Sequence, residues 1–497
     1  MKITHCLALA CVAGFANADK GGPVITERSL SVAAFVDAGQ VIQGTYVNDD
    51  GGKTPQDLQG VFMNRDGVAL TYSGTLNGNV HMNIGVGGLF WKPFLGIPGN
   101  ASTKKINFGP GISEASTQYD YNSRLTVKFG YFGYKYNPDA TNLGEYLLRS
   151  EAYPTILQNG TVGDWVWLGN EYKSMGVKVT WDLLDGALRQ DFLLFSDFYV
   201  SPLFDFSPSY VATWKVNKAF EIGGGFSLHR WLPIKPSETT PNQAGNIYVE
   251  IPNFPALSDP SDSVLGFNGG TLKGMEGQIV NFVDSSGSPI VRQGVDAQGR
   301  TIFILNSTGD TLRPTTETKL TFKAIEVMGR ASLNLSTLFG LNEKTTGPFK
   351  LFGEIAILGL QNQPYFYEDM TQRIPIMLGA DIPTFNWFDL FSVQCEYLKN
   401  PYPDNNFNQF QNTVPQPQLP SDNPAIYKLR EQEGVYNHDD FKWSMNLQKT
   451  IVSGWQAELQ VANDHLRVQD ESAQPSFMPV TRAKSDWYYL LRFLWSM

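Results

Sequence analysis

The sequence alternates apolar and polar residues with a period of two over many separate segments. From 441 to 448 (FKWSMNLQ), apolar side chains occupy every odd position, and 173–182, 349–360 and 483–497 show the same pattern. Period two is typical of a β-strand with two unlike faces. One such segment would also suit a soluble β-sandwich, whereas many long ones with aromatic residues near their ends favour a membrane barrel.

The composition agrees with a barrel. Aromatic residues make up 13% of the 497 residues and charged residues only 17%, below the ~25% of typical soluble domains. The mean hydropathy of −0.22 is nevertheless too polar for a bundle of membrane helices, and no segment offers the ~18 consecutive apolar residues of such a helix. Alternating lipid-facing and lumen-facing residues reconcile these values.

The N-terminus predicts a signal peptide over residues 1–18. A lysine precedes a short apolar core, which ends at the A-x-A cleavage site ANA. Cleavage there leaves 19–497 as a single barrel domain whose one cysteine, Cys395, cannot form an internal disulfide. Cleavage before Cys11, as in a lipoprotein, is the alternative, although the apolar stretch before that cysteine is short.

The alternation predicts an all-β, transmembrane, antiparallel barrel of about 16 strands, with a range of about 14 to 18. Three strands are less regular: 161–169 is needed mainly to keep the number even, 318–335 needs a bulge near Ala324, and 372–382 contains Pro375. The full set of expected strands is 30–46, 65–76, 80–91, 122–136, 161–169, 172–183, 187–198, 208–216, 219–232, 318–335, 348–361, 372–382, 388–399, 438–450, 455–468 and 483–497.

The connections between these strands alternate between short and long. Short turns are expected at 77–79, 185–186, 217–218, 383–387 and 451–454, and long connections at 47–64, 92–121, 233–317, 400–437 and 469–482. Bacterial barrels have short periplasmic turns and long extracellular loops. The long segments, above all 233–317 and 400–437, are therefore expected outside the cell.

Two segments, 137–160 and 336–347, break this rule, because they are long and would lie on the periplasmic side. Thr141 could cap a helix over 142–150, on which Glu145 and Arg149 lie four residues apart. Such a helix could form a small plug or rim helix. Alternatively, 137–160 could fold into the lumen and narrow a pore.

The sequence offers little to suggest enzyme chemistry. No G-x-S-x-G, H-E-x-x-H or C-x-x-C motif occurs, and neither a catalytic site nor a metal or cofactor is expected. His438 beside Asp439, and Asp464 beside His465, could form acid–base dyads on an external rim, but solvated loop ends explain them as well. The acidic turn 48–50 lacks the further ligands of a calcium site. The net charge of −10 disfavours nucleic acid and suits either a cation-preferring pore or an acidic surface.

In a pore, the charged residues on the polar strand faces would line the lumen and set ion preference. The sequence places eight such residues: Arg124, Lys128, Lys178, Glu354, Glu396, Lys442, Glu458 and Arg492. The same charges could instead fill a closed barrel with salt bridges.

With the signal peptide, the alternating strands, the rhythm of short turns and long loops, and an aromatic last strand, the chain resembles the porin class of outer-membrane proteins of Gram-negative bacteria. In that class the last strand is read by the barrel-assembly machinery. The residues in phase with that signal are Trp487, Tyr489, Leu491, Phe493 and Trp495, while Met497 replaces the usual terminal aromatic residue.

The resemblance implies an outer-membrane channel for passive diffusion of small hydrophilic solutes, without enzymatic activity. It also implies contact with outer-membrane lipid and lipopolysaccharide, and a homo-oligomer, often a trimer. The alternative is a structural or adhesive barrel that presents extracellular loops, as part of an envelope complex. A gated transporter is less favoured, because only ~11 residues would precede the first strand and leave no room for an N-terminal plug.

Overall fold

The computed structural model describes the strands and most short connections of the chain. The described residues are 25–46, 56–57, 59–60, 62–95, 107–148, 172–196, 204–234, 323–360, 370–399, 441–464 and 485–497, with isolated strands at 246–250, 271–275, 291–295, 301–305, 311–312, 314–315, 467–469 and 475–479. The expected signal peptide, the turn at 48–50, His438 and His465 lie outside these residues.

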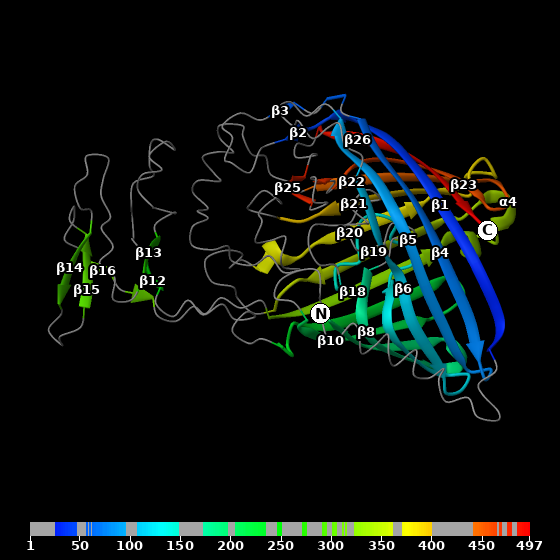
Figure 1. Cartoon of the computed structure of the whole chain (residues 1–497), viewed down its shortest axis with the longest axis horizontal. Helices are drawn as coiled ribbons and strands as arrows, with labels where there is room; N and C mark the ends of the chain where they lie inside the picture. Colours follow the sequence, from blue (N-terminus) through cyan, green and yellow to red (C-terminus); the bar gives the residue numbers. More distant parts are fainter. Residues whose placement is uncertain are drawn as a thin grey trace.

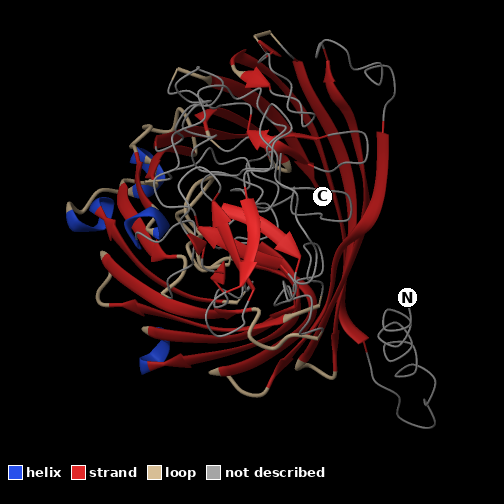
Figure 2. Ribbon diagram, turned by 90° about the vertical axis from the view of Figure 1, so that its left-hand side faces the viewer, coloured by secondary structure: helices blue, strands red, loops and turns tan. Residues whose placement is uncertain are grey.

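Sixteen strands form one closed barrel (Figures 1 and 2). Each strand pairs antiparallel with its neighbours, and β1 pairs with both β4 and the last strand, β26, which closes the cylinder. In chain order the barrel strands are β1 Ile25–Gln43, β4 Phe62–Leu76, β5 Val80–Leu95, β6 Asn107–Asp120, β7 Leu125–Tyr134, β8 Tyr172–Leu183, β9 Leu188–Ser196, β10 Phe206–Lys215, β11 Phe220–His229, β18 Ala324–Asn334, β19 Lys350–Ile357, β20 Ile376–Asp381, β21 Leu390–Tyr397, β22 Phe441–Val452, β23 Trp455–Asn463 and β26 Trp487–Ser496.

Short and long connections gather at opposite ends of the barrel. One end, the short-turn end, carries the connections 77–79, 121–124, 184–187, 216–219, 335–349, 382–389 and 453–454, together with the start of β1 and the end of β26. The described strand ends that flank 233–317 and 400–437 lie at the opposite end, which we call the long-connection end. The five predicted short turns all fall at the short-turn end, and the longer segment 336–347 forms two short helices there, α3 Leu335–Leu338 and α4 Glu343–Thr346.

The predicted number of strands is confirmed, but the predicted position of one strand is wrong. Residues 107–120, expected within a long loop, form β6, which pairs with β5 and β7. The expected strand 161–169 lies outside the described residues, and the barrel closes without it because β7 pairs directly with β8. Because β6 replaces the predicted strand 161–169, the segment that follows β7 starts at the other end of the barrel from the one predicted. The connection between β7 and β8 therefore leaves from the long-connection end rather than from the short-turn end.

The other two irregular strands predicted from the sequence both form, and each is shorter than predicted. The strand expected over 318–335 begins at Ala324, where a bulge was expected, and continues regularly to Asn334. The strand expected over 372–382 begins at Ile376, directly after Pro375, so the proline nitrogen is not needed in the ladder.

The outer surface of the barrel is apolar. Along β4 and β5, exposed Val68, Leu70, Ile84 and Val86 alternate with inward-facing residues. Large aromatic side chains are exposed near both ends of the strands: Trp181, Trp214 and Trp455 near the short turns, and Phe90, Phe108, Tyr397 and Phe441 near the opposite end. An apolar band between two aromatic girdles is the surface of a membrane-spanning barrel.

Small elements accompany the barrel. No helix among the described residues is long and apolar enough to cross a membrane. The connection between β11 and β18 contributes two small sheets, which are drawn beyond the long-connection end of the barrel (Figure 1). One sheet joins β12 Asn246–Glu250, β13 Thr271–Met275 and β17 Pro314–Thr315, and the other joins β14 Val291–Val295, β15 Thr301–Leu305 and β16 Thr311–Leu312.

Candidate functional site in the barrel lumen

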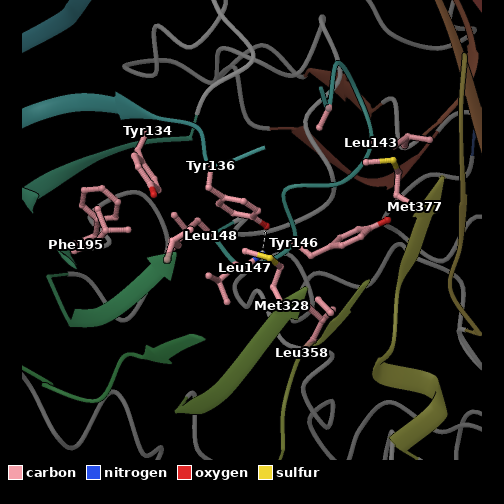
Figure 3. Close-up of a cluster of buried hydrophobic side chains, with 14 of the residues drawn as sticks. Tyr134, Tyr136, Leu143, Tyr146, Leu147, Leu148, Phe195, Met328, Leu358 and Met377 are labelled. Atoms are coloured by element: carbon pink, nitrogen blue, oxygen red, sulfur yellow. Dashed lines mark hydrogen bonds between the residues drawn. The ribbon is translucent and has the colours of Figure 1, made fainter. Parts of the chain in front are cut away.

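Residues 135–148, which follow β7, fold into the barrel, and we call them the inward segment. Their apolar side chains are buried against side chains that point inward from the strands (Figure 3). From the segment this cluster takes Tyr136, Ala140, Leu143, Tyr146, Leu147 and Leu148, and from the wall it takes Phe195, Val211, Met328, Phe352 and Met377, among others. Among the described residues, this cluster of buried apolar side chains therefore lies inside the barrel.

The described part of the inward segment is not helical, so the helix expected from residue 142 onward is wrong as far as residue 148. Gly144 and Glu145 both have positive φ angles, of 86° and 63°, which no right-handed helix accommodates. The backbone N–H groups of Glu145 and Tyr146 donate to a wall carboxylate instead of to carbonyl groups of a helix. Of the two expectations for 137–160, the part described, which ends at residue 148, agrees with the fold into the lumen.

That wall carboxylate is Glu354, on the inward face of β19. Its Oε1 accepts hydrogen bonds from the Tyr136 hydroxyl at 2.6 Å and the Tyr146 N–H at 2.8 Å. Its Oε2 accepts from the Asn137 side-chain amide at 2.7 Å and the Glu145 N–H at 3.0 Å. The carboxylate is buried and all four donors belong to the inward segment. Glu354 therefore holds both limbs of the segment at one point.

Further polar contacts fix the turn of the segment against β19 and β21. The Gln394 side-chain oxygen accepts from the N–H groups of Asn142 and Leu143 at 3.2 and 3.0 Å, and its amide donates to the Asp139 carbonyl at 3.2 Å. Lys350 forms an ion pair with the Asp139 carboxylate at 3.2 Å. The side-chain amide of Gln394 thus provides hydrogen-bond partners for backbone groups that would otherwise be buried in the lumen without one.

The far edge of the segment reaches still further around the wall. The Tyr146 hydroxyl donates to Glu396 on β21 at 2.8 Å, and the Asn142 amide donates to Asp464, just after β23, at 2.5 Å. In the closed strand order the segment therefore follows the wall from β7 round to β23. The wall opposite the inward segment consists of strands β26, β1, β4, β5 and β6.

Seven of the eight predicted lumen charges lie on inward faces. Lys128 pairs with Glu114 at 2.9 Å, and the ammonium of Lys178 lies 5.5 Å above the ring of Tyr134. Glu354 and Glu396 anchor the inward segment. Polar partners also hold the other three, as Lys442 donates to Asn463, Glu458 accepts from Asn446 and Gln448, and Arg492 pairs with Asp37.

Arg124 differs from the other seven. It lies in the 121–124 turn at the short-turn end, is largely exposed, and pairs with Asp185 of a neighbouring turn at 3.2 Å. Its guanidinium therefore belongs to the rim of the barrel rather than to the lumen.

Asp464, considered for a dyad with His465, is fully buried rather than solvated at a loop end. Its Oδ2 accepts from the Asn142 and Gln460 amides and from the Tyr488 hydroxyl, the last at 2.7 Å. These bonds give Asp464 a positioning role against the inward segment. Among the described residues, no group of three or more His, Cys, Asp or Glu side chains could hold a metal ion.

Tyr136 shows how strongly the segment is desolvated. Burial, and then the negative charges of Glu354 and Glu145, raise the pKa of its phenol well above the ordinary value of 10.0. The hydroxyl therefore remains a hydrogen-bond donor to Glu354 throughout the neutral range.

The anchoring role of Gln394 was missed from the sequence. It lies on the polar side of 388–399, a segment whose alternation is less regular than that of its neighbours. The sequence did indicate that 137–160 is unusual, but a polar residue on a strand face carries no sign of which distant backbone it will meet.

The last strand has the predicted alternation. Trp487, Tyr489, Leu491, Phe493 and Trp495 share the outward face of β26, while Tyr488, Leu490 and Arg492 are buried on the other. Met497 exchanges two backbone hydrogen bonds of 2.9 Å with Val32 of β1 and so extends the closing seam.

No protein-family model and no curated protein matches the chain. Solved structures are similar over nearly its whole length. Pseudomonas putida OprB at high pH matches 95% of this chain and 94% of its own, with 9% identity and a TM-score of 0.43. A mutant of the Rh. blastica porin matches 95% and 100%, with 9% identity and a TM-score of 0.40. The chain thus resembles porin structures, whereas the barrel itself is established by the strand pairing.

Proposed function

We propose that this chain is an outer-membrane channel for passive diffusion of small hydrophilic solutes, and that the inward segment narrows the channel. A closed barrel of sixteen strands normally encloses an aqueous channel. The observation that carries the proposal is the placement of 135–148, which Glu354 and Gln394 fasten to one side of the lumen. A segment fixed in this way restricts the lumen to the side of β26, β1, β4, β5 and β6.

The inward side of that opposite wall carries charged groups beside the buried apolar side chains of Phe35, Val41 and Leu490. Glu114 pairs with Lys128 of the adjacent strand β7, His81 and Asp120 approach to 2.9 Å, and Arg492 forms a buried pair with Asp37. Fixed charges of both signs would orient polar solutes without binding them tightly.

Swelling of protein-containing liposomes tests the proposal. In isosmotic solutions of neutral saccharides of increasing size, we expect the swelling rate to fall steeply with solute size. Liposomes carrying the same amount of unfolded protein are the control. If liposomes with folded protein do not swell in any saccharide, the barrel is closed and the channel proposal fails.

The proposal includes the cellular setting. The short-turn end would face the periplasm, β26 would carry the assembly signal, and the chain would form homo-oligomers, with a trimer expected. Membrane fractionation and crosslinking of the native protein test these points. Recovery in the inner membrane would contradict the first, and a monomer under all extraction conditions would contradict the last.

A second candidate function is presentation of external loops, as an adhesin or a subunit of an envelope complex. The two small sheets between β11 and β18, drawn beyond the long-connection end, favour it (Figure 1). Co-purification of a stoichiometric partner after mild detergent extraction, lost when 235–322 is deleted, would support this candidate. A protein that is recovered alone and still conducts would support the channel.

A further inference from the structure

Two neighbouring connections at the short-turn end carry an exposed apolar surface. One is 335–349, which contains α3 and α4, and the other is 382–389, between β20 and β21. They are joined because the backbone N–H groups of Thr384 and Phe385 both donate to the Thr346 carbonyl at 2.9 Å. Six large apolar side chains of these connections are exposed, and we call them the rim patch: Leu338, Phe339, Leu341, Phe385, Trp387 and Phe388.

Hydrogen bonds hold the backbone beneath the rim patch. Asn342 caps α4, since its side chain accepts from the Lys344 N–H. The Lys449 ammonium, which comes from the end of β22, donates to the Asn386 carbonyl at 2.8 Å. The apolar side chains are therefore exposed on a hydrogen-bonded backbone, and Trp387 exposes 79% of its surface.

The rim patch continues the lipid-facing surface of the barrel. Leu351 on β19 and Leu378 on β20 point outward and are exposed. Phe349 has the same phase as Leu351, and its ring lies 6.4 Å from the ring of Phe339 in a stacked arrangement. Ile382 likewise follows Leu378 in the outward phase of β20 and is exposed. Apolar cover therefore runs from the strands onto both connections.

The wall that carries the rim patch has the shortest regular strands of the barrel. β19, β20 and β21 contain 8, 6 and 8 residues, whereas a membrane strand normally has about 9–11. Backbone pairing continues past their ends, as where the Ile382 N–H donates to the Phe391 carbonyl at 2.8 Å. Apolar side chains on the connections therefore lengthen the lipid-facing surface of this wall.

The distribution of aromatic residues favours lipid over a second protein as the partner of the rim patch. Trp181, Trp214 and Trp455 are exposed near the same end on other parts of the wall. Contact with one partner protein would be confined to one side, whereas a bilayer surrounds the barrel. Tryptophan prefers the level of the lipid headgroups, because its ring is apolar and its N–H can stay hydrated. Only three charged residues occur in the two connections, so immersion would desolvate few charges.

We propose that the rim patch is inserted into the headgroup and upper acyl region of the phospholipid leaflet at the short-turn end. The connections 335–349 and 382–389 are then membrane contacts rather than turns in the aqueous phase. Aromatic and aliphatic side chains exposed together in this way anchor a protein in the interface. The barrel is thereby anchored at its shortest wall. This inference depends on the membrane location of the barrel but not on conduction.

Quenching by brominated lipid tests the proposal. Wild-type protein and Trp387→Phe are reconstituted into phosphatidylcholine vesicles, with or without phosphatidylcholine that is brominated near the headgroup end of its acyl chains. The difference in tryptophan fluorescence between the two proteins reports Trp387. We expect brominated lipid to quench this component at least about twofold, because an interfacial ring lies at the depth of the first acyl carbons. Aqueous iodide should quench it less.

Lys218→Trp in the Trp387→Phe background provides the matched control. It places a tryptophan in the exposed turn between β10 and β11, two strands of 10 residues each. We expect iodide, and not brominated lipid, to quench this probe. Phe385→Trp, made in the wild type, adds a second probe to the rim patch, and its extra fluorescence should be quenched by lipid. This variant tests the patch even if Trp387→Phe does not fold.

Two results would overturn the proposal. Quenching of Trp387 by iodide but not by brominated lipid would place the rim patch in water. Protection from both quenchers would show that a second copy of the chain or another protein covers it. The channel is tested separately: a barrel that shows lipid quenching but never swells liposomes contradicts the channel alone. A barrel that swells liposomes without lipid quenching contradicts the membrane contact of the rim patch alone.

Discussion

Glu354 is the residue on which the position of the inward segment most depends, because its one carboxylate accepts four hydrogen bonds from that segment. In Glu354→Gln only one side-chain oxygen remains, so two donors lose their acceptor inside the lumen. We expect docking of the segment to weaken by about 2–3 kcal/mol. Hydrogen exchange of 135–148 should accelerate, while exchange in the strands should not change.

Glu343→Gln provides the matched control, since Glu343 lies exposed on α4 at the short-turn end and makes no described contact with the segment. Unchanged exchange in Glu354→Gln would show that the other contacts hold the segment without Glu354.

Gly144 allows a second test, because two independent constraints require glycine there. Its φ angle is +86°, and an added Cβ would lie 2.7 Å from Cε of Met377. Gly186 has the same φ of +86° but open space around it. We expect Gly186→Ala to cost about 1 kcal/mol from backbone strain. Gly144→Ala should cost up to about 1 kcal/mol more, because the flexible end of the buried Met377 side chain would have to move aside. Urea unfolding measures both, and equal costs would contradict the close packing against Met377.

Tyr136 gives the segment a dependence on alkaline pH. Because its pKa is raised in the folded protein, the neutral phenol contributes stability that is fully present below pH 10.0. That contribution is lost as the pH rises above the ordinary pKa of tyrosine toward the raised one. We expect the protection of 135–148, which is the exchange rate relative to the base-catalysed intrinsic rate, to fall at strongly alkaline pH. Tyr136→Phe should remove this component of the pH dependence, and an unaltered alkaline profile in the variant would contradict the assignment.

At the scale of elements, the seam between β1 and β26 closes the barrel and contains a buried ion pair. Arg492 holds both oxygens of Asp37 at 2.7 and 2.8 Å, and its guanidinium lies 4.7 Å from the centre of the Phe35 ring. In Arg492→Gln the carboxylate of Asp37 remains buried without its cation. We expect a loss of about 3–5 kcal/mol in unfolding free energy.

The seam prediction has two controls. Arg124→Gln breaks the exposed pair with Asp185 and should have little effect, because solvent screens that pair. Adding Asp37→Asn to Arg492→Gln should recover much of the loss. If the seam variant is no less stable than Arg124→Gln, the ion pair does not stabilise closure.

The strands and turns also show how much of the fold can be predicted from the sequence alone. Clear alternation located most strands, and turn chemistry located the short-turn end. Residues 107–120 were not predicted as a strand because the alternation of exposed and buried side chains changes phase within them. Phe108 and Ile112 are exposed before Ser113, whereas Ala115 and Tyr119 are exposed after it. At that point the register with β5 shifts. A bulge of this kind makes one strand read as two unrelated pieces.

The inward segment could be predicted only as a set of alternatives. Its anchors, Glu354 and Gln394, lie more than 200 residues further along the chain, with separations of 217 for Asn137–Glu354 and 252 for Asn142–Gln394. Nothing local in the sequence encodes such a pairing. It follows from barrel closure, which brings β7 and β21 to the same lumen.

For the whole molecule, one wall of the barrel carries the docked segment, and the other wall carries both charged and apolar side chains. In the proposed channel, the width of the passage depends on the docking of 135–148. Wild-type protein and Glu354→Gln, compared in planar bilayers, test this dependence most directly through single-channel conductance. We expect discrete wild-type steps and larger, noisier steps in the variant. A silent wild-type barrel, or identical steps in both proteins, would contradict the account.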